Sequence, residues 1–319
     1  MVVTAIGIHG GCGTLDRSLM SEPEWADARE HLASALRAGW RILSRGGRSL
    51  DAVEATIMVM EDSPHFNAGY GAALTADARH ELDASIMDGA SLAAGAVCGV
   101  ERIRNPIQAA RAVMEKSPSV LITGPAADAF ADRCGLAMVD NGYFTTARRV
   151  AALASLKRRA ADGTAAKASE AEKHGTVGCV ALDATGDLAA GTSTGGFNNK
   201  PPGRVGDSPI IGAGTYARNG VCAVSGTGQG EIFIRRVAAY DVAARMMYAG
   251  ATLADATKTV VFDTLASHGI GAGMIAIDAL GNVVAPFNTI GMYRGWITTE
   301  GEMVVATHRE EHALGRVSS

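Results

Sequence analysis

The sequence predicts an α/β (α+β) fold in which sheets pack on each other and are covered by helices. Strand-like segments stand at both ends of each half of the chain, with pairs of helical patterns between them. The composition, 47% hydrophobic and 19% charged over 319 residues, can supply a large core and argues against intrinsic disorder. Internal repeats are not evident and the halves do not separate, so we expect one domain spanning 1–319.

The elements of the first half follow from apolar runs, capping residues and helix breakers. An apolar run at 2–8 predicts a strand that leads into a glycine loop, His9–Gly13. Ser21 is a predicted N-cap, and Gly46-Gly47 ends that helix. A second helix ends before Pro64, because proline disfavours helix in the residue before it. The further predicted elements are a turn-rich loop at 66–71, strands at 82–87 and 94–100, a helix at 106–116 and a short strand at 120–123.

The second half begins after a segment of different character. Residues at about 158–175 are rich in Ala, Lys and Glu and carry no apolar stripe, which predicts a flexible linker, with a solvated helix as the alternative. Apolar runs at 176–182 and 188–194 then predict a hairpin. The remaining predicted elements are a polar loop at 195–206, strands at 210–216 and 221–225, helices at 231–248 and 253–268, and a hairpin of 274–278 and 283–286.

Charge and cysteine usage exclude several classes of protein. A formal net charge of −4 without a basic run argues against nucleic acid as a partner, and no apolar run reaches the roughly 18 residues that a membrane span needs. The five cysteines show no CxxC spacing, and the N-terminus has no basic signal region, so a reducing, cytoplasmic location is expected. His308 and His312 lie beside acidic residues and predict a solvated tail rather than a metal site.

Thr176 is the residue with the clearest chemical potential. It begins a buried-looking strand directly after the polar segment, and Gly175 precedes it. If the chain were cut between them, Thr176 would carry both a hydroxyl nucleophile and a free α-amine, whose pKa of about 7.7–8.0 suits a general base. Gly175 lacks a Cβ and so tolerates the strained backbone that such a cut requires. A Gly-Thr pair alone is an ordinary strand start, so the surrounding motifs decide the interpretation.

Several ordered motifs make the sequence recognisable. HGTVGCVALD at 174–183, GTSTGGFNNKPPGRVGDSPIIGAGTYA at 191–217 and SGTGQGE at 225–231 closely resemble the isoaspartyl peptidase and plant-type L-asparaginase family of N-terminal-nucleophile (Ntn) hydrolases. HGGCG at 9–13 and the segments at 66–89, 95–106 and 286–295 resemble it too. The resemblance covers nearly the whole chain and implies a four-layer αββα sandwich of the Ntn-hydrolase type.

The resemblance implies an enzyme that matures by cutting itself. Autoproteolysis at Gly175-Thr176 would give an α subunit, 1–175, and a β subunit, 176–319. Thr176 would then attack β-aspartyl amide bonds in isoaspartyl dipeptides or L-asparagine, with no cofactor for catalysis. A homodimer of αβ units is implied as the assembly.

The resemblance also assigns roles around the nucleophile. Thr194 would orient the Thr176 hydroxyl, and Thr227 and Gly228 would form the oxyanion hole and bind substrate. Arg204 and Asp207 would hold the α-carboxylate and α-ammonium groups of an amino-acid-like substrate, a pairing that their opposite charges suit.

Two loops are implied as supports of the site. The segment Glu61 to Tyr70 corresponds to one that wraps a structural sodium ion with backbone carbonyls in the family, and Asn67 within it would support the nucleophile. Gly10 and Gly11 belong to a mobile glycine loop beside the nucleophile. That loop has neither the GxGxxG nor the GxxxxGK[ST] spacing, so nucleotide binding is not expected.

Two rival functions stay open from the sequence. A glycosylasparaginase would use the same chemistry on a sugar-linked asparagine, although the absence of a signal peptide and the presence of Gly175 count against it. A homologue that keeps the fold, never cleaves and only binds a small ligand is the alternative from another class.

Overall fold

The computed structural model describes residues 3–162 and 175–317 and contains two β-sheets. The strands of the nine-stranded sheet are β1 (Ala5–Gly13), β2 (Leu82–Asp88), β3 (Ala94–Val100), β4 (Leu121–Thr123), β5 (Val177–Leu182), β6 (Leu188–Thr194), β11 (Gly291–Ile297), β12 (Glu302–Ala306) and β13 (Glu311–Arg316). Their spatial order is β13-β12-β11-β1-β5-β6-β2-β3-β4. The smaller sheet has the order β10-β9-β8-β7. Its strands are β7 (Thr215–Arg218), β8 (Cys222–Gly228), β9 (Ala272–Asp278) and β10 (Val283–Val284).

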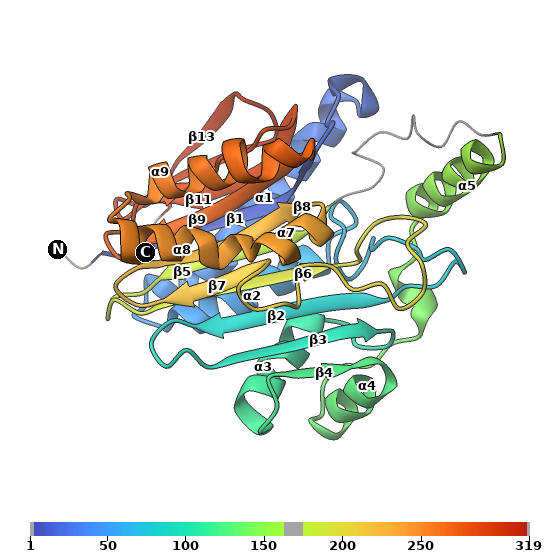
Figure 1. Cartoon of the computed structure of the whole chain (residues 1–319), viewed down its shortest axis with the longest axis horizontal. Coiled ribbons are helices and arrows are strands. Elements are labelled where there is room, and N and C mark those ends of the chain that lie inside the picture. Colours follow the sequence, from blue (N-terminus) through green and yellow to red (C-terminus); the bar gives the residue numbers. More distant parts are fainter. Residues whose placement is uncertain (1–2, 163–174, 318–319) are drawn as a thin grey trace.

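Most of the described helices cover the outer face of a sheet (Figure 1). The helices are α1 (Glu22–Leu43), α2 (Ser49–Glu61), α3 (Pro106–Lys116), α4 (Gly124–Arg133), α5 (Ala147–Ala161), α7 (Gly230–Arg236), α8 (Ala238–Ala249) and α9 (Leu253–Lys258), of which α5 projects away from both sheets. Helices α1, α2 and α3 contact the nine-stranded sheet, whereas α8 and α9 contact the smaller one. The chain is therefore a mixed α/β protein. No helix in the described ranges combines the length and the apolar character that crossing a bilayer requires.

The two sheets pack directly on each other through the middle strands of the larger one. Strands β1, β5 and β6 contact β7, β8 and β9. Gly7 in β1 lies at this interface, where an added Cβ would come within 2.8 Å of Val283 and 2.9 Å of Ile275. One apolar cluster fills the space beneath α1 to α3, and a second fills the space between the sheets and beneath α8 and α9. The ends of β5 and β6 are thus held by a core on both faces.

The local signals of the first half are confirmed by the structure. Ser21 caps α1 in a capping box, in which its backbone N–H donates to Glu24 Oε2 at 2.7 Å. Helix α2 ends at Glu61, and α3 begins at Pro106. The hairpin predicted at 176–194 forms, with β5 and β6 antiparallel and Val177 opposite Ser193.

One predicted element of the first half and part of the linker need correction, and two helices were not predicted. The glycine loop His9–Gly13 is part of β1, which continues through it by means of a bulge between His9 and Gly11. Helices α4 and α5 form where the sequence analysis gave no helix, and Figure 1 shows α5 projecting beside the sheets. Because α5 runs to Ala161, residues 158–161 are helical, and the rest of the predicted linker, 163–174, lies outside the described residues.

The second half departs from the prediction at both helices and one strand, and its last three strands were not predicted. The helix expected over 253–268 is an α-helix only to Lys258 and continues as a π-helix over Thr259–Leu265 and a 3-10 turn over Ala266–His268. The helix expected over 231–248 is split into α7 and α8 by Val237, which has φ of 49° and ψ of 49°. Such a left-handed valine is strained by about 1–2 kcal/mol. Hydrogen bonds from the first amides of α8 offset this strain, because the backbone N–H groups of Ala239 and Tyr240 donate to the carbonyls of Ala213 and Gly212. Gly212 and Ala213, which accept these hydrogen bonds, fall within the strand expected at 210–216. Strand β7 therefore begins only at Thr215.

The C-terminal region contains three strands, β11 to β13, which extend the larger sheet. His308 was predicted to lie in a solvated tail, and this prediction is wrong. Its side chain is buried, its Nε2 lies 2.8 Å from Leu15 O and its ring packs edge-on against Trp25. His312, on β13, is exposed as expected.

Candidate active site

The Gly175–Thr176 peptide lies at the start of β5, where the nine-stranded sheet faces the smaller one. Thr176 is buried, and its Oγ1 lies 2.8 Å from Gly175 O and 3.2 Å from Thr194 Oγ1. Thr194 is the last residue of β6, and the register that places Val177 opposite Ser193 brings the two threonines together. The family resemblance implied that Thr194 lies beside Thr176, and the hairpin accounts for it because a short hairpin fixes which residues face each other.

Three donors converge on the carbonyl oxygen of Gly175. Besides the Thr176 hydroxyl, Thr194 Oγ1 donates to it at 3.0 Å and Asn67 Nδ2 at 2.8 Å. The Asn67 amide is fixed by two more bonds, since Nδ2 also donates to Gly196 O at 2.6 Å and Oδ1 accepts from Ala73 N at 2.6 Å. This carbonyl is therefore strongly polarised by groups whose orientation is set in advance.

The bulge in β1 brings its backbone against the same peptide bond. Gly11 has φ of 102°, and a Cβ on it would lie 2.9 Å from Gly175 Cα and 3.1 Å from Thr176 N. Gly10 is equally restricted, because a Cβ there would lie 2.7 Å from the Phe66 ring. Both positions require glycine for reasons of space, and Gly11 also for its backbone conformation.

A buried chain of polar side chains lies beneath the nucleophile and was missed by the sequence analysis. His9 Nε2 lies 2.9 Å from Ser225 Oγ, and Thr192 Oγ1 lies 2.7 Å from the same oxygen. The chain continues through Thr215, 2.5 Å from Thr192, to Ser85. Burial lowers the pKa of His9 to about 3, so its ring is neutral at physiological pH.

Gly178 makes room for this chain within β5. A Cβ on it would lie 1.9 Å from Ser225 Oγ and 2.3 Å from His9 Nε2. The members come from five strands of both sheets, so no sequence spacing could have grouped them.

Arg204 and Asp207 lie together at the cleft but are not paired with each other by a hydrogen bond. Arg204 Nε donates to Glu231 Oε1 at 3.0 Å, and its guanidinium lies 4.7 Å from the centre of the Phe197 ring. From the sequence, Glu231 was expected only as a helix start, and Phe197 had no expected role. Stacking and a carboxylate together hold the guanidinium plane in one orientation.

Asp207 is a buried carboxyl group with an open acceptor. Its Oδ2 has no hydrogen-bond partner among the residues that the structure describes. Burial raises the pKa of Asp207 to about 7. A buried carboxylate without a partner is costly, so an incoming cation such as an ammonium group would be favoured at this oxygen.

Thr227 and Gly228 end β8 on the opposite side of the nucleophile. Gly228 lines the cleft, whereas Thr227 is fully buried and its Oγ1 accepts from Cys12 N at 3.4 Å. The structure therefore brings Gly228 onto the cleft wall and places the Thr227 side chain against β1.

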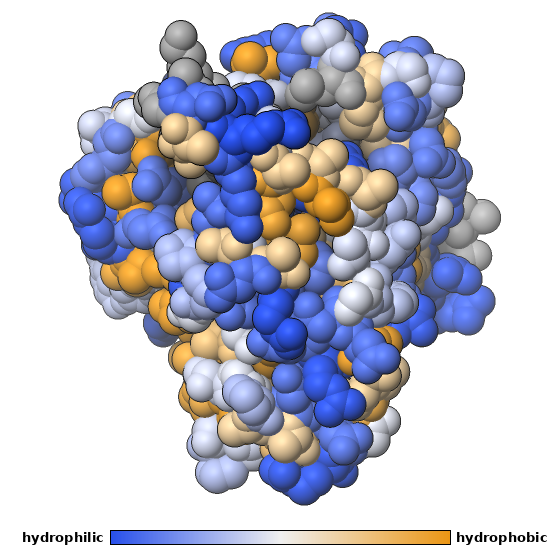
Figure 2. Space-filling model, turned by 90° about the vertical axis from the view of Figure 1, so that its right-hand side faces the viewer, coloured by the Kyte–Doolittle hydropathy of each residue, from blue (hydrophilic) through white to orange (hydrophobic). Residues whose placement is uncertain are grey.

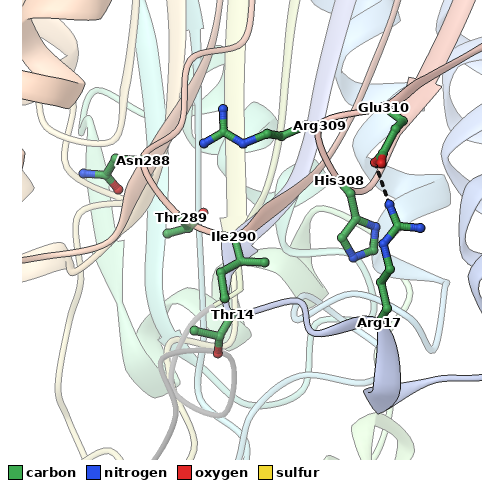
Figure 3. A pocket seen from close by; sticks show the side chains of 8 residues that line it. All are labelled: Thr14, Arg17, Asn288, Thr289, Ile290, His308, Arg309 and Glu310. Atoms are coloured by element: carbon green, nitrogen blue, oxygen red, sulfur yellow. Dashed lines mark hydrogen bonds and ion pairs between the residues drawn. The ribbon is translucent and has the colours of Figure 1, made fainter.

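The cleft at the nucleophile is narrow, with about 10 Å³ of open space. It is lined by Gly175, Thr176, Thr194, Gly196, Phe197, Arg204, Gly206, Asp207, Ser208 and Gly228. A larger hollow, drawn in Figure 3, contains none of these residues and is lined by Thr14, Arg17, Asn288, Thr289, Ile290, His308, Arg309 and Glu310. An ion pair of 2.7 Å between Arg17 and Glu310 crosses one side of that hollow. The candidate catalytic residues thus lie in the smaller of the two spaces.

A threonine hydroxyl held beside a polarised carbonyl is the arrangement of a hydrolase with a threonine nucleophile. The comparisons with known proteins agree with this class. The asparaginase family model (Asparaginase_2) matches residues 2–307, and the chain belongs to this family.

Curated relatives of the chain are similar over most of their length. Isoaspartyl peptidase of Escherichia coli (strain K12) is 49% identical over 91% of this chain and 92% of its own. Isoaspartyl peptidase/L-asparaginase of Rattus norvegicus is 41% identical over 91% of this chain and 85% of its own. Plant-type L-asparaginase of Pyrobaculum calidifontis is 38% identical over 92% of this chain and 97% of its own.

Proposed function

We propose that this protein is an isoaspartyl peptidase/L-asparaginase with Thr176 as its nucleophile. The observation that carries the proposal is the set of three donors, from Thr176, Thr194 and Asn67, around the carbonyl oxygen of Gly175. The family membership, and the contacts that order helices, sheet, sheet and helices, support a four-layer αββα sandwich of the Ntn-hydrolase type as a single domain spanning 1–319.

Maturation would begin with attack of Thr176 Oγ on the carbonyl carbon of Gly175. As the new C–O bond forms, the carbonyl oxygen becomes negative and Thr194 Oγ1 and Asn67 Nδ2 stabilise that charge, while the hydroxyl proton is transferred to the Thr176 nitrogen. Collapse of the intermediate breaks the C–N bond, and the Thr176 nitrogen, which now carries that proton, leaves as an amine. Water then hydrolyses the resulting ester, which frees the Gly175 carboxylate and gives the α subunit, 1–175, and the β subunit, 176–319.

The mature enzyme would repeat the chemistry on a substrate. The free α-amine of Thr176 takes the proton from its own hydroxyl, and Oγ attacks the side-chain carbonyl of a β-aspartyl amide. Gly228 lines the cleft at the end of β8, and its backbone N–H would stabilise the developing oxyanion, together with the Thr227 hydroxyl once that side chain turns from Cys12 N towards the cleft. The leaving amine departs with a proton, and water releases aspartate from the enzyme ester. None of these steps requires a cofactor.

Arg204 and Asp207 would select an amino-acid-like substrate. The Arg204 guanidinium, held by Glu231 and Phe197, offers the planar fork that a carboxylate binds. The open Oδ2 of Asp207 would accept from the α-ammonium group. The relatives' names include both isoaspartyl peptidase and L-asparaginase, so a substrate panel is the experiment that ranks the two substrates.

The segment Glu61–Tyr70 fits the structural sodium ion that the family resemblance implies. An added Cβ on Gly71 would lie 3.0 Å from the carbonyl oxygens of both Pro64 and Phe66, and one on Gly69 would lie 2.3 Å from Glu61 O. The carbonyl oxygens of Pro64 and Phe66 therefore approach one point, and oxygen ligands suit a hard cation, whereas Glu61 O lies beside a different glycine and accepts from Tyr70 N at 2.7 Å. A bound sodium ion would order this segment, which carries Asn67.

We also propose a homodimer of αβ units and a cytoplasmic location. Large apolar side chains that are exposed support a partner surface, among them Tyr248 at 75% and Ile290 at 56% exposure. Figure 2 shows one face on which hydrophobic residues gather centrally among hydrophilic ones. The five cysteines are free thiols, which supports a reducing compartment.

Replacing Thr176 tests the central proposal. Thr176→Ala removes the nucleophile, so denaturing electrophoresis and intact mass should show one uncut chain without activity, whereas the wild type should give two fragments. Arg204→Ala should still be processed but show a strongly raised KM. Normal processing of Thr176→Ala would contradict the proposal, and an uncut, inactive wild type would favour the rival interpretation as a ligand-binding homologue.

A glycosylasparaginase is the second catalytic candidate. A glycosylated asparagine included in the substrate panel distinguishes it from the proposed function, because the proposal expects isoaspartyl dipeptides or L-asparagine to be cleaved in preference.

A further inference from the structure

A cluster of metal-binding side chains lies outside the catalytic cleft, where α1 meets the segment after α2. Asp27 and His31 are four residues apart on α1, and His65 follows Pro64 in the Glu61–Tyr70 segment. The ligand atoms of the three side chains all lie within 4.8 Å of one another. Asp27 is exposed and the two histidines are partly buried, so an ion in solution could reach the cluster.

The three side chains are directed towards one common point. Residues four apart on a helix project from the same face, so Asp27 and His31 point in a common direction. His65 Nε2 lies 2.8 Å from Asp27 Oδ2, and the rings of His31 and His65 have centroids 4.8 Å apart. Atoms that bind one zinc ion at bond lengths of about 2.0–2.2 Å lie at distances from one another that are similar to those in this cluster. Small side-chain rotations would therefore suffice to bind the ion.

The backbone on the loop side of the cluster is already held. Arg148, on α5, donates to Pro64 O at 3.1 Å and to His65 O at 3.0 Å. His65 N also donates to Ser63 Oγ at 3.3 Å. An ion would therefore meet a fixed loop and a fixed helix, which reduces the entropy lost when the ligands are ordered.

The charges around the cluster favour a cation. Glu24 interacts electrostatically with His65, and Glu30 does so with His31, although Arg37 pairs with Glu30 at 2.6 Å. Arg148 is the cation nearest to the loop side, and its guanidinium is directed to backbone carbonyls.

We propose that Asp27, His31 and His65 form a binding site for a divalent transition metal ion, with zinc as the best match. Two imidazoles and one carboxylate are the ligand set of many zinc centres, and water completes the coordination. The site differs from the sodium-binding space in the same segment, which offers backbone carbonyls to a hard cation. The ion joins α1 to the segment that carries Asn67, so it acts as a clip at the support of the nucleophile.

The experiment is a zinc titration of the processed protein by calorimetry. Cys134 is the one cysteine that is not buried, so all proteins carry Cys134→Ser to exclude thiolate binding. The parent should bind one equivalent of zinc, and zinc should raise its melting temperature. His31→Ala and His65→Ala should each weaken binding by more than about 100-fold, given that losses of 10–100-fold are typical even for residues that only support a ligand.

Three comparisons make the result specific. His268→Ala is the control variant, because it removes a histidine outside the cluster, whose Nε2 lies 2.9 Å from Arg236 Nε. It should leave zinc binding unchanged. Magnesium and sodium should not compete, because they prefer oxygen ligands. Thr176→Ala should bind zinc as the parent does, which separates this proposal from the proposed function. Absence of stoichiometric binding, or equal binding by the His31→Ala and His65→Ala variants with normal melting curves, would overturn the proposal.

Discussion

Asp207 provides a prediction in which stability and activity change in opposite directions. Burial raises the pKa of this carboxyl group from 3.8 to about 7, and its Oδ2 lacks a partner among the described residues. Because a tenfold change in proton affinity corresponds to about 1.4 kcal/mol, the ionised carboxylate costs the fold about 4 kcal/mol above pH 7. Asp207→Asn removes that charge and should stabilise the protein while weakening substrate binding.

The dependence on pH follows from the direction of the pKa change. A carboxyl group whose pKa is raised by folding contributes most stability below its unfolded pKa of 3.8, and this contribution is lost as the pH rises through about 7. The asparagine variant does not titrate. Its stability relative to wild type should therefore be about 2–3 kcal/mol greater at pH 8 than at pH 5, which corresponds to several degrees in Tm for a chain of this size.

Thermal melts of the processed proteins at pH 5 and pH 8 provide the assay. Asp263→Asn makes the same chemical change at an exposed site on the helical turn Thr259–Leu265 and should show no such difference. KM for L-asparagine should rise in Asp207→Asn at pH 8, where the wild-type carboxylate is ionised. A stability difference that is equal at the two pH values would refute the reasoning, as would a destabilised variant at both.

Three further predictions concern the surroundings of the site. Gly11→Ala should slow self-cleavage, because its Cβ would lie 2.9 Å from Gly175 Cα. The control Gly186→Ala, also at positive φ but with nothing within 4 Å of its Cβ, should be processed normally. The measurement is the fraction of chain cleaved over time in each variant. Glu231→Gln should raise KM by about 3- to 10-fold with kcat nearly unchanged, because the partly exposed ion pair between Glu231 and Arg204, 2.9 Å long, is worth about 1 kcal/mol. An equal fall in kcat would contradict a role in binding alone. Lys200→Met should destabilise the protein by about 3–5 kcal/mol, since Lys200 is buried near Asp83 and its Nζ donates to Glu81 O at 2.8 Å. Adding Asp83→Asn should restore part of the lost free energy of unfolding, measured by urea denaturation. No recovery would mean that the two charges are not coupled.

The zinc site illustrates a limit of sequence reasoning that also applies to the catalytic cleft. Asp27 and His31 share a helical face, which spacing can reveal, but His65 reaches them only because α1 and α2 pack together. Likewise, Glu231 meets Arg204, and His9 meets Ser225, through contacts between segments far apart in the chain.

The sequence by itself determined the features that depend on neighbouring residues. Ser21 with Glu24 specified a helix start, and the β5–β6 hairpin brought Thr176 to Thr194 because a short turn fixes the register. The ordered motifs also indicated the family to which the chain belongs.

The tertiary structure alone decided where local preference was overruled. The segment His9–Gly13 has the composition of a loop, yet it is a strand because β11 pairs with it as far as Gly13, whereas β5 pairs with it only at His9. Val237 adopts a left-handed conformation because the start of α8 must bond to Gly212 and Ala213. In each case hydrogen bonds to distant segments outweigh a conformational preference of about 1–2 kcal/mol, and such bonds are not encoded in any short stretch of sequence.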